Sequence, residues 1–214
     1  PGAACAALDR RAGAGFLAIV MPGGSANLDP IEYGKPEVLP RMGEELAEAV
    51  FAAPRQEVPA EGTVSTRTAA YRMRFLVPDE QSLAADAAAL AAGPQVSGAD
   101  RTCLEWARDR LEDLRGGRLR AECRVALNVL AAGGVRFALL PFETFTETAR
   151  AIRAAVPGRV LAASCADGIL GYLPVASAYP EGGYEVAVAH RFYDRLAPAP
   201  GAAEEIARLV RGLL

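Results

Sequence analysis

Hydrophobic positions along the chain recur with two periods, that of a helix and that of a strand. Recurrence every three to four residues, with charges on the opposite face, predicts amphipathic helices. Alternation, or a short apolar run bounded by glycine or proline, predicts strands. Helices are predicted at 3–11, 39–53, 81–92, 100–114, 144–155 and 201–214. Strands are predicted at 15–21, 64–77, 120–130, 135–141 and 159–164.

The order of these elements predicts the fold class. Residues 120–130 and 135–141 are apolar strands joined by a short segment that ends in Gly133 and Gly134, which is typical of a β-hairpin. Residues 15–53 are interpreted as a strand–loop–helix unit. We therefore expect an α/β fold, with a layered mixed β-sheet flanked by helices. No internal repeat or linker divides the sequence, so residues 1–214 are treated as a single region.

Composition narrows the class of protein. A chain of 214 residues with 51% hydrophobic content indicates a soluble globular protein with a sizeable core. The formal net charge of −3 offers no basic surface for nucleic acid. No apolar run approaches the ~20 residues of a membrane span, so none is expected.

The cysteines do not identify a compartment. No C-x-x-C pair occurs among them, and buried free thiols are expected rather than a disulfide scaffold. They are Cys5, Cys103, Cys123 and Cys165. A cytoplasmic and a secreted location both stay open.

A segment rich in tyrosine and glycine, 166–185, fits neither a helix nor a simple strand. Its glycines permit positive φ or close approach, and its prolines fix the local chain direction. Tyr172, Tyr179 and Tyr184 lie between them. Two interpretations are open: the tyrosines are a positioned functional set, or they are amphipathic residues at the edge of the core.

Glu143 stands between a predicted strand and a predicted helix, where a carboxylate projects into the crevice above a sheet. It is a candidate ligand for a metal or a substrate dipole. The alternative is an acid that complements the N-terminal end of the helix dipole. Position alone does not separate the two.

Two further features carry weaker signals. The Gly23-Gly24 loop matches no phosphate-binding spacing, and a tight turn is the expected role. His190 is the only histidine, so this chain by itself cannot form a site that needs two histidines, and a partly exposed structural role is expected.

Three motifs, in order and in spacing, resemble those of the neutral/alkaline non-lysosomal ceramidases. The loop motif of that family, G-x-x-G-D-[IV]-[NS]-P, is similar to residues 23–30, and its P-G-E motif is similar to Pro141-Phe142-Glu143. Its G-Y-x-x-x-x-x-x-Y motif followed by Y-E is similar to 171–185. The anchors span nearly the whole chain, and residues from about 55 to 118 match only loosely.

The resemblance implies a zinc-dependent amidohydrolase that cleaves N-acyl sphingosine or a related amide. Zinc in that family is held by two histidines, a glutamate and a tyrosine. Glu143 and Tyr172 take the positions of the last two. Tyr184 takes the position of the tyrosine that polarises the substrate amide. Asp29 falls in the catalytic loop, where the family has Asn or Ser.

The resemblance also implies an incomplete catalytic domain, because both family histidines precede the matched segment. The expected partners are a missing N-terminal portion of the same domain and a lipid-like or other small amide substrate. The sequence departs from the motifs at Asn27, Asp29 and Phe142. The alternative function is therefore a non-catalytic member of the fold that binds a small molecule or has a structural role.

Overall fold

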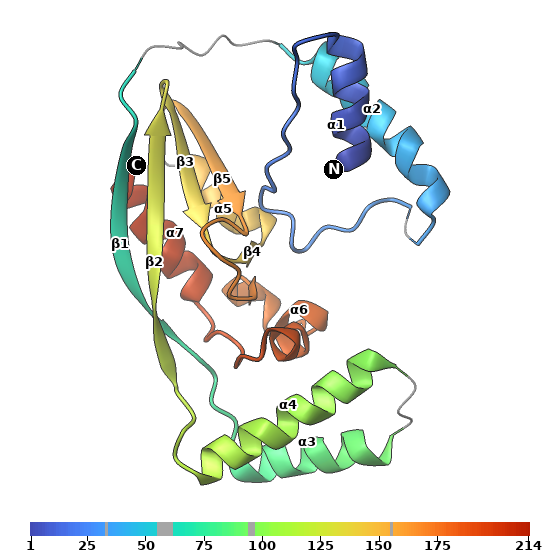
Figure 1. Cartoon of the computed structure of the whole chain (residues 1–214). Helices are drawn as coiled ribbons and strands as arrows, with labels where there is room; N and C mark the ends of the chain where they lie inside the picture. Colours follow the sequence, from blue (N-terminus) through green and yellow to red (C-terminus); the bar gives the residue numbers. More distant parts are fainter. Residues whose placement is uncertain (33, 55–61, 94–96, 155) are drawn as a thin grey trace.

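A mixed β-sheet of four strands lies on the left in Figure 1, with β1 along its outer edge. The structure is a computed structural model that describes residues 1–32, 34–54, 62–93, 97–154 and 156–214. The strands lie in the order β1 (Ser65–Arg74), β2 (Glu122–Ala132), β3 (Val135–Leu140) and β5 (Arg159–Ser164). The first two pairs are antiparallel, and β3 pairs with β5 in parallel. The predicted α/β class with a mixed sheet is confirmed.

The hairpin between β2 and β3 forms where the glycines predicted it. Ala132 pairs with Val135, so Gly133 and Gly134 alone make the turn. Their φ angles are 55° and 76°. A two-residue turn with both central residues at positive φ matches the twist of the flanking strands, and glycine adopts this conformation without steric cost.

Two helices cover one face of the sheet and enclose the main core (Figure 1). They are α5 (Thr146–Ala154) and α7 (Ala202–Leu213). The residues of this core include Leu127, Leu140, Ile152, Ile206 and Val210, all of them fully buried. Their burial follows from the strand and helix periods seen in the sequence.

The opposite face of the same sheet is largely open in the described part of the chain (Figure 1). On β1 and β2 it carries polar and charged side chains such as Thr68 and Arg124 beside the small side chains of Ala70 and Ala126, all of them exposed. Leu161 on the outer strand β5 is 43% exposed.

Two helix pairs lie away from the sheet. Helices α1 (Gly2–Ala12) and α2 (Leu39–Ala52) pack closely, because Gly43 has no side chain: a Cβ there would lie 2.6 Å from the carbonyl carbon of Ala3. Helices α3 (Glu80–Ala92) and α4 (Gly98–Arg115) enclose a second core around Trp106, whose Nε1 donates to the Arg195 carbonyl at 2.8 Å. None of the helices in the described ranges has the length and hydropathy needed to cross a membrane.

The strand predicted at 15–21 is wrong. The segment makes no strand pairing with any described residue, and Leu17 and Ile19 are 75% and 83% exposed. Isolated hydrogen bonds fix it instead. The Asp9 carboxylate accepts from the Ala18 amide at 2.7 Å, and just after the segment the Pro22 carbonyl accepts from the Ser164 amide at 2.9 Å. An apolar run becomes a strand only where a neighbouring strand can pair with it, so the strand–loop–helix unit predicted over 15–53 reduces to its loop and helix α2.

Other boundaries shift only slightly. The helix predicted at 144–155 begins at Thr146, and its predicted last residue, 155, lies outside the described residues. All four cysteines have free thiols, as expected, but only Cys103 is fully buried.

A matched pair of leucines tests this architecture. Leu127→Ala removes a fully buried side chain from the centre of β2 and should lower the free energy of unfolding by about 2–5 kcal/mol. Leu17→Ala, in the exposed segment, should change it by no more than about 0.5 kcal/mol. Urea denaturation measures both variants. Equal losses would mean that 15–21 is packed as a strand after all.

Candidate active site

A short parallel bridge brings the two proposed metal ligands side by side. Strands β4 (Glu143–Thr144) and β6 (Tyr172–Leu173) pair so that Glu143 lies opposite Tyr172. The Glu143 amide donates to the Gly171 carbonyl at 2.9 Å, which fixes the register. Gly171 has a φ of 105°, and a Cβ there would lie 3.4 Å from the Tyr193 ring. Glycine at 171 therefore allows both the turn into β6 and the close approach of this ring.

Glu143 and Tyr172 line a cavity of about 640 Å³ together with the two predicted catalytic residues, Asp29 and Tyr184. The cavity lies beyond the carboxyl ends of the parallel strands β3 and β5, where open α/β sheets commonly bind ligands. The other lining residues are Pro22, Gly23, Ser25, Ala26, Leu28, Thr144, Ser164, Cys165 and Glu185. The fold thus gathers all four sequence-predicted site residues around one space.

Tyr193, which the sequence did not single out, holds the carboxylate. It ends a short 3-10 helix, η3 (Ala189–Tyr193), and its hydroxyl donates to Oε1 of Glu143. Its ring also lies edge-on to Tyr172, with centroids 6.3 Å apart. Tyr172 contacts Tyr184 in the same way at 5.7 Å. A carboxylate surrounded by three phenols is the chemical centre of the cavity.

The phenols are protonated at neutral pH in this arrangement. Burial raises the pKa of Tyr172 and of Tyr193, and the hydrogen bond of each hydroxyl to the Glu143 carboxylate raises it further. Burial and the same carboxylate raise the pKa of Tyr184 and of the Cys165 thiol. Each of these groups can therefore donate a hydrogen bond. A bound cation would reverse the shift and favour a phenolate ligand.

The loop before Asp29 is fastened to the start of α5 and forms one wall of the cavity. The Asn27 Oδ1 accepts from the Thr146 amide at 2.9 Å and so caps the helix. The Asn27 Nδ2 donates to Oε2 of Glu147 at 2.9 Å. The Ala26 amide donates to the Thr144 carbonyl at 3.1 Å. Asn27 thus has a structural function that its motif position did not reveal.

The structure separates roles that the sequence left open. Glu143 does not lie in the first turn of α5: it belongs to β4, ahead of the helix start at Thr146, and its carboxylate accepts from Tyr193. The acid in the first turn is Glu147. Tyr179 does not line the cavity; its hydroxyl donates to the Pro198 carbonyl at 2.7 Å, and burial raises its pKa to about 12. Glu143 and Tyr172 are the two proposed ligands that this chain supplies. In the described ranges, no group of three or more His, Cys, Asp or Glu residues is placed to hold a metal ion.

Gly24 is needed for close packing and not for backbone conformation, because neither Gly23 nor Gly24 has a positive φ. A Cβ on Gly24 would lie 2.5 Å from the Ala149 Cβ and 2.8 Å from the Phe145 carbonyl oxygen. At Gly23 the nearest such atom is 3.9 Å away. The tight turn expected at these glycines lies directly after them, over Ser25 to Leu28, where the Leu28 amide donates to the Ser25 carbonyl at 3.0 Å.

Gly24→Ala should therefore displace the loop from α5 and lower the free energy of unfolding by about 1–3 kcal/mol. Gly23→Ala adds the same methyl group one residue earlier and should stay within about 0.5 kcal/mol of the unmodified chain. Chemical denaturation of both variants checks the pair. A neutral Gly24→Ala would contradict the packing of this loop on α5.

His190, the only histidine, lines a different cavity of about 330 Å³ near α3 and α4. Its ring lies edge-on to Trp106 with centroids 5.1 Å apart, which fits the structural role expected for it. Its Nδ1 is buried without a hydrogen-bond partner in the described structure. Burial lowers the pKa of His190 from 6.5 to about 4, and the nearby positive charge of Arg191 is the second, smaller cause.

Protonation of His190 should therefore oppose folding. The folded chain binds fewer protons than the unfolded chain between pH 6.5 and about 4. Stability should be full above pH 6.5 and should decline as the pH falls, by roughly 3 kcal/mol from this group at most. His190→Gln should flatten that part of a plot of unfolding free energy against pH. An unchanged slope would show that His190 is protonated equally in both states.

Comparisons with known proteins bear on the fold. Neither models of protein families nor curated protein sequences match the chain. Among solved structures, the chain is similar to the neutral ceramidase from Pseudomonas aeruginosa, with a TM-score of 0.57 and 14% sequence identity. The similarity covers 99% of this chain but 39% of the ceramidase, so the chain spans well under half the length of that protein. At this level of identity the likeness shows a ceramidase-like fold, in agreement with the motifs.

Proposed function

We propose that this chain is part of a zinc-dependent amide hydrolase of the neutral ceramidase type, acting on N-acyl sphingosine or a related amide. The observation that carries the proposal is the cavity in which Glu143, Tyr172, Tyr184 and Asp29 meet. Their motifs are far apart in the sequence, and a ceramidase-like fold places them together.

Glu143 and Tyr172 would hold the zinc ion. A carboxylate and a phenol side by side are oxygen donors suited to it. Tyr193 would orient the carboxylate, as residues hydrogen-bonded to metal ligands commonly do. Zinc bound there would supply Lewis acidity and an activated water near neutral pH. The remaining ligands, two histidines, would come from an N-terminal portion of the same domain.

The surface of the chain supports such a partner segment. The exposed residues of 15–21 are apolar, as is Leu161 on the outer strand of the open sheet face, and burying them would favour association with another layer. The partial coverage of the ceramidase structure agrees with this. The isolated 214-residue chain should accordingly be inactive.

Two residues of the chain would act on the substrate. The Tyr184 hydroxyl, kept protonated, would donate a hydrogen bond to the oxygen of the amide as negative charge develops there. Asp29 would place a hydrogen-bond acceptor near the scissile bond. Leu28 lines the same cavity and is 62% exposed, so it would contact the apolar part of a lipid-like substrate.

A non-catalytic role is the second candidate. Asp29 stands in place of the family's Asn or Ser, and Phe142, which replaces the family's glycine beside Glu143, is fully buried. In that case the cavity would bind a small molecule or serve as part of a structural module. Zinc binding combined with the absence of amidase activity would identify this outcome.

The test measures zinc in the chain joined to the sequence encoded directly upstream of Pro1. One zinc ion per chain is expected, together with hydrolysis of an N-acyl sphingosine. Glu143→Ala should weaken zinc affinity by about 100-fold or more, because a direct ligand is lost. Glu185→Ala is the matched control, because Glu185 lines the same cavity and is not a proposed ligand. Unchanged zinc affinity in Glu143→Ala would refute the ligand assignment.

A further inference from the structure

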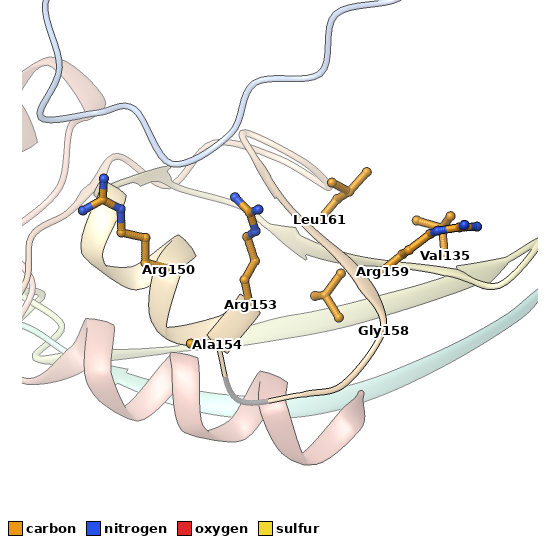
Figure 2. A pocket seen from close by; sticks show the side chains of 8 residues that line it. Val135, Arg150, Arg153, Ala154, Gly158, Arg159 and Leu161 are labelled. Carbon is orange, nitrogen blue, oxygen red and sulfur yellow. The ribbon is translucent and has the colours of Figure 1, made fainter. Parts of the chain in front are cut away.

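A second depression, of about 740 Å³, lies where α5, the turn after it and β5 meet (Figure 2). It shares no lining residue with the cavity around Glu143. Its lining residues are Val135, Arg150, Arg153, Ala154, Gly158, Arg159, Val160 and Leu161. The proposed hydrolase function does not involve this depression.

Positive charge is concentrated in the depression. Three of its lining residues are arginines and none is acidic. Arg150 and Arg153 lie one turn apart on α5, and both guanidinium groups point to the same side (Figure 2). Like charges at this helical spacing repel by a few tenths of a kcal/mol. Arg159 extends from β5 at the other end of the depression (Figure 2).

The two arginines on α5 are not neutralised within the described chain. Neither side chain makes an ion pair or a hydrogen bond to a described residue. Glu147, the acid one turn before Arg150, accepts a hydrogen bond from Asn27 instead. By contrast, Arg41 and Arg118 each contact two carboxylates. An oxyanion bound between Arg150 and Arg153 would compensate their charge.

The rest of the depression is apolar. Val135 and Val160 are almost completely buried, and Leu161 is 43% exposed with its side chain on the same side as the two guanidinium groups (Figure 2). Such a site favours a ligand that has an anionic head and a short apolar part. Guanidinium groups bind phosphate in a bidentate geometry, and a phosphate monoester carries up to two negative charges, which would compensate two arginines.

We propose that this depression binds a small phosphate monoester with an apolar substituent. The phosphate oxygens would bind the guanidinium groups of Arg150 and Arg153, and the substituent would lie on Leu161. The inference does not depend on zinc or on amide hydrolysis.

The probe is n-hexyl phosphate, with inorganic phosphate as its polar counterpart, measured by isothermal titration calorimetry on the 214-residue chain. Hexyl phosphate should bind more tightly than phosphate, and added salt should weaken both. Arg150→Gln/Arg153→Gln should reduce its affinity by about tenfold or more, because two charge-assisted contacts are lost. Arg101→Gln/Arg108→Gln, an equal charge change on the exposed face of α4, is the matched control and should leave the affinity unchanged.

Three results would overturn the inference: no binding of hexyl phosphate, equal losses in the two double variants, or equal affinity for phosphate and hexyl phosphate. Binding to phosphatidylglycerol vesicles without binding of hexyl phosphate would also overturn it and would assign the arginines to a membrane surface. Circular dichroism of both double variants establishes that they are folded.

Discussion

The pairing of β4 with β6 is the constraint on which the rest of the site depends. Each strand has only two residues, yet their register places Glu143 directly opposite Tyr172. The neighbouring backbone reinforces it, because the Leu170 amide donates to the Pro141 carbonyl at 2.8 Å. With this register fixed, the Tyr193 ring packs on Gly171 and its hydroxyl reaches the carboxylate. A shift of one residue would turn Tyr172 to the other side and separate the acid from its phenols.

Most of the fold was predictable because its signals are local. The helical period over 201–214 and the glycines of the β2–β3 turn determine α7 and the hairpin without reference to distant residues. The segment 15–21 shows the limit of such reasoning. Its apolar pattern is that of a strand, but a strand also needs a partner for its backbone, and no property of the segment itself reveals whether one is present.

The site was predictable only in part, for a related reason. Motif spacing led to Glu143, Tyr172, Tyr184 and Asp29, which the fold brings to one cavity. Tyr193 escaped notice because its partner lies fifty residues away in the sequence, and its neighbours suggest nothing beyond a polar–apolar stretch. Contacts formed by tertiary folding leave little trace in the local pattern of a single sequence.

Helix α4 helps to position the Glu143 carboxylate without contacting it, through the residues that follow Tyr193. Trp106 donates a hydrogen bond to the Arg195 carbonyl, and Arg110 contacts both the carbonyl oxygen and the carboxylate of Asp194. Asp194 and Arg195 directly follow Tyr193. Asp194 has a φ of 52°, and a non-glycine residue keeps this left-handed conformation only where surrounding contacts stabilise it. The α3–α4 pair therefore stabilises the backbone that positions Tyr193 beside the cavity. Variation in its helices would alter the orientation of a chemical group that neither helix touches.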